Sequence, residues 1–65
     1  MKIRVNGKDI DFLGGSVKDL MNLLKLDAKN LVVEKNESVI HGERYSMEEV
    51  HEGDVIEIVH FVGGG

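Results

Sequence analysis

The chain has 65 residues, 42% of them hydrophobic and 31% charged, and its formal net charge is −4. This composition predicts one small folded domain and argues against a nucleic-acid-binding protein, which needs a basic face. The chain has no cysteine, so it can form neither a disulfide nor a thiol-borne intermediate of its own. No signal segment or membrane-spanning segment is recognisable, and we therefore expect a cytoplasmic protein without a membrane partner.

The three histidines, His41, His51 and His60, are spread along the chain and do not have the spacing of metal ligands. No Ser/His/Asp or His/Glu cluster stands at a useful spacing either. The sequence therefore predicts no metal site and no independent enzyme.

The N-terminal segment has the pattern of a β-hairpin. Ile3 and Val5 alternate with polar residues, as in a half-buried strand. Asn6-Gly7 follows, and this dipeptide favours a turn in which both positions have positive φ. A second strand is expected over about residues 8–12.

The next segment predicts a helix that opens at Ser16. Ser16 with Asp19 three residues later is a variant of the capping box, with an acid in place of the usual Glu or Gln. The helix is expected to end near Leu26. Its apolar positions share one face: Val17, Leu20, Met21 and Leu24.

The second half of the chain predicts further strands. Residues 31–35 and 38–40 are expected to be strands joined by the turn Asn36-Glu37, and Gly53-Asp54 turns into a last strand that starts at residue 55. Between them, Ser46 with Glu49 suggests one capped helical turn that points Met47 and Val50 inward. The element order predicts an α+β fold, with one helix on a mixed sheet of four to five strands.

The last strand has two unequal faces. Burying Glu57 without a partner is costly, so its face should point to solvent and Ile56 and Ile58 into the core. Val59 and Phe61 then point outward. We interpret the outward apolar residues nearest the end of the chain as a docking surface for a partner: Val32, Val59, Phe61 and Val62.

The sequence ends in Gly63-Gly64-Gly65 directly after this strand. No further element has to be connected there, so we expect a folded domain over residues 1–62 and a flexible glycine tail over residues 63–65. A tail without side chains that ends in a carboxylate suits a terminus that is itself the reacting group. Gly65 is then the reacting residue, and Gly63 and Gly64 enter the active site of a partner.

Taken together, these features resemble the β-grasp, ubiquitin-like sulfur carriers, and most closely the ThiS family of thiamine biosynthesis. The similarity spans the full length and rests on residues 3–7, Val33-Glu34 before Asn36, Gly53-Asp54 and residues 59–65. One departure is Glu37-Ser38 after Asn36, where many relatives carry Gly-Glu.

The resemblance implies a carrier rather than an enzyme, with no bound cofactor. A ThiF-like partner would adenylate the Gly65 carboxylate with ATP. A cysteine desulfurase would then supply the sulfur that turns Gly65 into a thiocarboxylate, and a ThiG-like thiazole synthase would take up that sulfur.

Three other readings share parts of this pattern. The chain could be a carrier of the kind found as the small subunit of molybdopterin synthase, which uses the same chemistry at its tail. It could be a ubiquitin-like modifier that is joined to lysines of target proteins. A passive β-grasp interaction module would need no free terminus at all.

Overall fold

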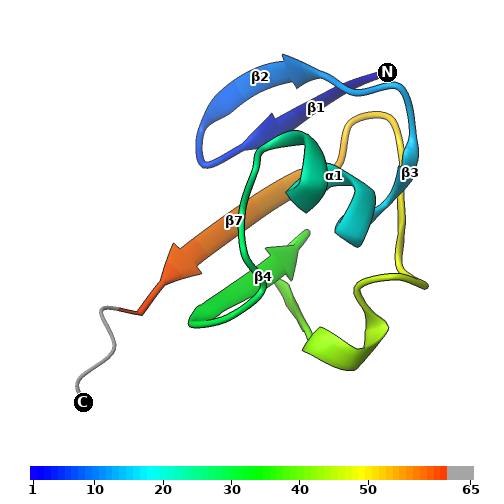
Figure 1. Cartoon of the computed structure of the whole chain (residues 1–65). Helices are drawn as coiled ribbons and strands as arrows, with labels where there is room; N and C mark the ends of the chain where they lie inside the picture. Colours follow the sequence, from blue (N-terminus) through cyan, green and yellow to red (C-terminus); the bar gives the residue numbers. More distant parts are fainter. Residues whose placement is uncertain (62–65) are drawn as a thin grey trace.

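Five strands make one mixed sheet in the computed structural model, which describes residues 1–61. The strand order is β2-β1-β7-β4-β5. α1 lies across one face of this sheet (Figure 1). The predicted arrangement of one helix on a mixed sheet is thus confirmed. The sheet consists of β1 (Lys2–Val5), β2 (Lys8–Asp11), β4 (Leu31–Lys35), β5 (Ser38–Ile40) and β7 (Val55–His60).

Two tight turns set the pairing of the outer strands. Asn6 and Gly7 have φ of 49° and 82°, so the predicted hairpin between β1 and β2 forms with both turn residues at positive φ. The turn between β4 and β5 has the same form, with Asn36 at 51° and Glu37 at 72°. Glu37 is a side-chain-bearing residue in a position that favours glycine.

α1 (Val17–Leu23) is fixed at both ends by local hydrogen bonds. The Ser16 hydroxyl accepts from the Asp19 N–H, and the Asp19 carboxylate accepts from the Ser16 N–H, which completes the predicted capping box. The helix ends three residues before the predicted Leu26, because Lys25 adopts a φ of 59°. The N–H groups of Lys25 and Leu26 then donate to the carbonyls of Asn22 and Met21, which is a Schellman motif.

The core lies between α1 and the sheet. Ile3, Val17, Leu20, Val33 and Ile56 are at most 1% exposed. Burying one such side chain stabilises the fold by about 1.5–3 kcal/mol relative to leaving it in water. No helix in residues 1–61 is long and apolar enough to cross a membrane.

The segment between β5 and β7 differs from the prediction. The helical turn expected at Ser46 does not form; a 3₁₀ turn, η1 (Gly42–Arg44), precedes Tyr45 instead, and Met47 is 65% exposed. Tyr45, 6% exposed, is the inward anchor. The short strands β3 (Gly15–Ser16) and β6 (Glu49–Val50) pair beside it.

The backbone of residues 45–48 binds the first turn of α1, and no helical turn starts at Ser46. The carbonyls of Tyr45 and Glu48 accept from the N–H groups of Lys18 and Val17, at 2.9 and 2.8 Å. N–H groups in the first turn of a helix have no partner within the helix. The segment therefore provides acceptors for the first N–H groups of α1, while Glu49 and Val50 pair with β3 and do not continue a helical turn from Ser46.

Candidate functional site

β7 carries the chain toward its C-terminal glycines from the middle of the sheet (Figure 1). It pairs in parallel with β1, through Arg4↔Val55 and Val5↔Ile56, and antiparallel with β4 as far as Leu31↔His60. The Phe61 N–H then donates to the Asn30 carbonyl at 2.7 Å. Val62, Gly63, Gly64 and Gly65, four of the predicted site residues, lie outside the described residues.

The strand faces follow the predicted parity. Ile56 and Ile58 are buried, whereas Val59 is 51% and Phe61 is 56% exposed. Val32 lies directly opposite Val59 and is half-buried. Three residues of the predicted docking surface are therefore on one face of the sheet, on the side away from α1. Docking itself stays a prediction.

Four further residues share this outer face. The sheet register brings them beside the predicted ones, because β7 lies next to β4 and β4 next to β5. The alternation of side chains along β7 already indicated that Val55 and Glu57 point outward. Which residues of β4 and β5 lie beside them depends on the strand order, which the sequence does not give. The additional outward residues are Glu34, Val39, Val55 and Glu57.

A buried carboxylate holds the turn that precedes β7. Asp54 is 9% exposed and accepts from Asn36 Nδ2 at 2.9 Å and from the His51 N–H at 2.7 Å. Burial by itself raises the pKa of Asp54, but these two hydrogen bonds, with the positive charge of Lys35 at 3.9 Å, outweigh it and leave the pKa below its usual 3.8. Because Asn36 Oδ1 also accepts from the Val55 N–H at 2.9 Å, the cluster fixes the start of β7.

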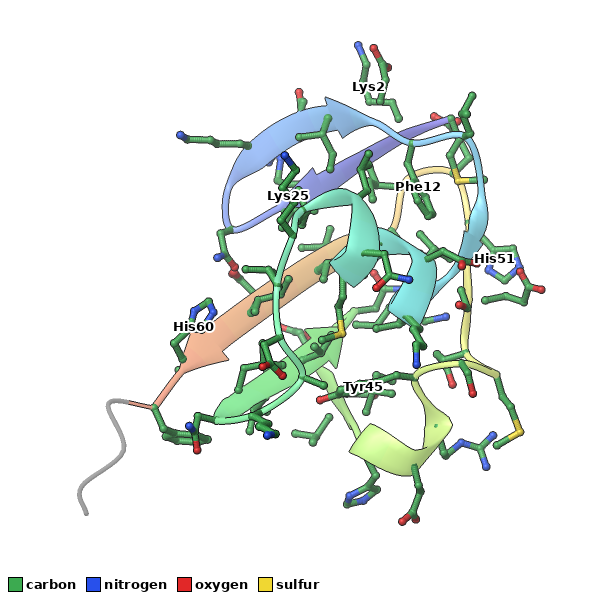
Figure 2. All side chains as sticks on the ribbon, in the orientation of Figure 1. Lys2, Phe12, Lys25, Tyr45, His51 and His60 are labelled. Atoms are coloured by element: carbon green, nitrogen blue, oxygen red, sulfur yellow. The ribbon has the colours of Figure 1, made fainter. Side chains whose placement is uncertain are left out.

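The histidines do not form a site. His51 and His60 lie on opposite sides of the view in Figure 2, and both are exposed. Within residues 1–61, no group of three or more His, Asp or Glu side chains is placed to hold a metal ion.

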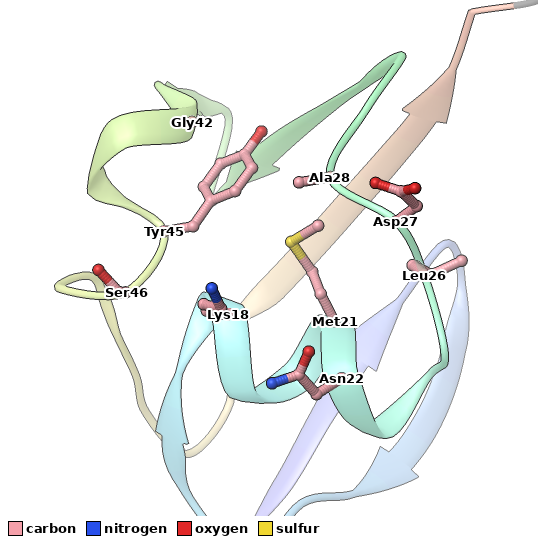
Figure 3. Close-up of a pocket in the computed structure, with 9 residues that line it drawn as sticks. All are labelled: Lys18, Met21, Asn22, Leu26, Asp27, Ala28, Gly42, Tyr45 and Ser46. Atoms are coloured by element: carbon pink, nitrogen blue, oxygen red, sulfur yellow. The ribbon is translucent and has the colours of Figure 1, made fainter.

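A pocket of about 360 Å³ lies on the helix side of the molecule (Figure 3). Met21 of α1 and Tyr45 point toward one another across it, and both belong to the core. The outer face with Val59 and Phe61 is on the other side of the sheet. The pocket is thus separate from the outer face. Its remaining lining residues are Lys18, Asn22, Leu26, Asp27, Ala28, Gly42 and Ser46.

Comparisons with known sequences agree on one family. The model of the ThiS family matches residues 3–65. The sulfur carrier protein ThiS of Bacillus subtilis is 45% identical over 65 residues, which cover 97% of this chain and 98% of that protein. A thiazole synthase of Paramagnetospirillum magneticum is 35% identical over 66 residues; these cover the whole of this chain but 20% of the synthase.

A solved structure gives the same result for the fold. The crystal structure of the thiamine biosynthesis protein ThiS from Geobacter metallireducens matches with a TM-score of 0.87 at 33% identity, and each chain is covered completely. The predicted β-grasp fold is confirmed by this match.

Proposed function

The chain belongs to the ThiS family, and from this we propose that Gly65 is the residue on which it carries sulfur. The protein is a sulfur carrier of thiamine biosynthesis rather than a catalyst. The observation that carries the proposal is the position of β7. This strand leads from the centre of the sheet to the glycines, and the family match extends through Gly65.

The proposed chemistry begins at the terminal carboxylate. A free α-carboxylate has a usual pKa of about 3.5, so it is ionised at neutral pH and is a poor electrophile. Adenylation by a ThiF-like enzyme joins the carboxylate to the α-phosphate of ATP and releases pyrophosphate. AMP is then a good leaving group, and glycine places no side chain beside the carbonyl under attack.

Sulfur would enter by displacement of AMP. If a desulfurase delivers it as a persulfide, attack on the acyl carbon releases AMP and forms an acyl disulfide. A second thiol then cleaves the S–S bond, which leaves the Gly65 thiocarboxylate and a new disulfide between the two thiols. The carrier needs no cysteine and no bound cofactor of its own for these steps, and ATP is consumed by the partner.

The length of the C-terminal segment is consistent with delivery of Gly65 into the active site of a partner. Residues 62–65 span at most about 13 Å when fully extended, at roughly 3.3 Å each. This length lets Gly65 enter an active site while Val59 and Phe61 stay on the partner's surface. We propose thiazole synthase as the acceptor, because one such synthase contains a segment similar to the whole of this chain.

Intact mass tests the proposal. The full chain is incubated with a ThiF-like enzyme, ATP, cysteine and a desulfurase. We expect a mass gain equal to the exchange of one oxygen for sulfur, on the C-terminal peptide. A chain without Gly65, and a chain extended by one alanine after it, should stay folded and show no gain. A gain in either variant, or none in the wild type with active enzymes, would refute the role of Gly65.

A further inference from the structure

Two glutamates occupy directly opposite positions on the outer face of the sheet. Glu34 of β4 pairs in register with Glu57 of β7. Side chains at directly opposite positions of antiparallel strands are close neighbours, and like charges there are destabilising. Neither residue belongs to the core, so packing does not explain the pair.

The cations near this pair are engaged elsewhere. Arg4 lies opposite Val55 on β1, on the same face, and its Nε lies 3.1 Å from Asp9 Oδ1. Lys35 follows Glu34 in β4, but its Nζ points to the other side of the sheet and lies 2.9 Å from Glu48 Oε2. Of the ion pairs formed within residues 1–61, none includes Glu34 or Glu57.

Apolar side chains of β4, β5 and β7 flank the two glutamates on this face, whereas the β1 side carries the polar Arg4 and Asn6. Val39 lies opposite Glu34 on β5 and is 54% exposed, and Val55 and Val59 flank Glu57 along β7. Val32 of β4 lies opposite Val59 on the same face. When a partner covers these valines, it excludes water from the glutamates between them. An ion pair formed by the glutamates is then stronger than it would be in water.

We propose that the Glu34–Glu57 pair binds an arginine side chain of thiazole synthase. A guanidinium has several N–H donors in one plane and can bond two carboxylates at once, which a lysine ammonium does less well. The inference rests on the proposed function, which makes thiazole synthase the acceptor. The face continues along β7 into Phe61, so a synthase that accepts the glycines lies against it.

A binding experiment with neutral isosteres tests this pairing. Glu34→Gln, Glu57→Gln and the double variant are titrated, as full chains, against purified thiazole synthase by calorimetry at low and high salt. We expect the double variant to bind about tenfold more weakly and to depend less on salt. Its melting temperature should equal or exceed that of the wild type, because a repulsion has been removed.

Glu43→Gln is the matched control, since it removes one negative charge from the exposed η1 turn. Its affinity should stay within about twofold of the wild type, because screening weakens distant charges. Equal binding by the double variant and the wild type would overturn the inference. So would a double variant that binds the synthase normally but fails to acquire a thiocarboxylate, because the arginine would then belong to the activating enzyme.

The proposed function is tested separately. Formation of the thiocarboxylate is measured without the synthase, so it can succeed while the Glu34–Glu57 pairing fails. A wild-type chain that becomes a thiocarboxylate but shows no binding to the synthase would overturn the pairing and leave the role of Gly65 standing.

Discussion

The side chain of Asn6 hydrogen-bonds both main-chain groups of Ile58. Its Oδ1 accepts from the Ile58 N–H at 2.7 Å, and its Nδ2 donates to the Ile58 carbonyl at 3.2 Å. The backbone of Asn6 turns away into the hairpin at a φ of 49°, so the carboxamide takes the place that the next residue of β1 would have had. The pairing between β1 and β7 is thereby extended past Ile56.

Asn6→Gly should therefore destabilise the protein. Glycine keeps the positive φ, so the substitution isolates the loss of the two hydrogen bonds, which we expect to cost about 1–3 kcal/mol. Urea unfolding measures the difference. Asn30→Gly is the control, because Asn30 also has a positive φ, 60°, and is exposed. An Asn6 variant no less stable than the Asn30 variant would contradict the assignment.

Glu37→Gly should stabilise the protein. Glu37 sits at a φ of 72°, where a residue with a Cβ is strained and glycine is not, so the gain should be about 1 kcal/mol. The reverse exchange at Gly7 gives the comparison. An added Cβ there meets nothing within 4 Å, and the φ is 82°, so Gly7→Ala should cost a similar amount through conformation alone. If Glu37→Gly lowers the unfolding midpoint, the turn is not strained.

Stability should fall in acid because of Asp54. Its pKa is lowered in the folded state, so its contribution is complete above the unfolded pKa, about 3.9, and is lost as pH falls through the lower folded pKa. Asn36→Ala removes one of the hydrogen bonds that lower this pKa. We expect NMR titration of the Asp54 carboxyl to show a higher pKa in that variant, and urea unfolding to show a smaller loss of stability in acid that is complete at a higher pH. An unchanged Asp54 titration would refute the role given to Asn36.

Phe61→Ala should weaken docking without harming the fold. Phe61 is 56% exposed, so the unfolding midpoint should hardly change. If its ring contacts the activating enzyme, the Kd should rise roughly tenfold. Leu13→Ala removes another exposed apolar side chain, 103% exposed, from the loop before β3, and it should bind as the wild type does. Equal weakening by both variants would show a nonspecific surface effect.

Local signals in the sequence predicted much of this fold. Asn6-Gly7 and the pair Ser16 and Asp19 act over a few residues, so the hairpin and the helix start followed from them directly. The end of α1 was predicted too late, because the left-handed position is occupied by Lys25 rather than by a glycine that would mark it.

Long-range relations could not be predicted in the same way. The hydrogen bonds from the Asn6 side chain to Ile58 depend on β7 lying beside β1. The Glu34–Glu57 pair depends on the register of β7 with β4. Alternation along a strand says which residues share a face, but the strand order decides which of them meet.

The parallel pairing of β1 and β7 has a mechanical consequence. Tension between the N-terminal strand and the end of β7 pulls two parallel neighbours in opposite directions, so their hydrogen bonds are loaded in shear and must give way together. A strand at the sheet edge that was pulled sideways would lose its bonds one after another. A pull on the end of β7 is thus opposed by several bonds to β1 at once, so the last strand resists unravelling.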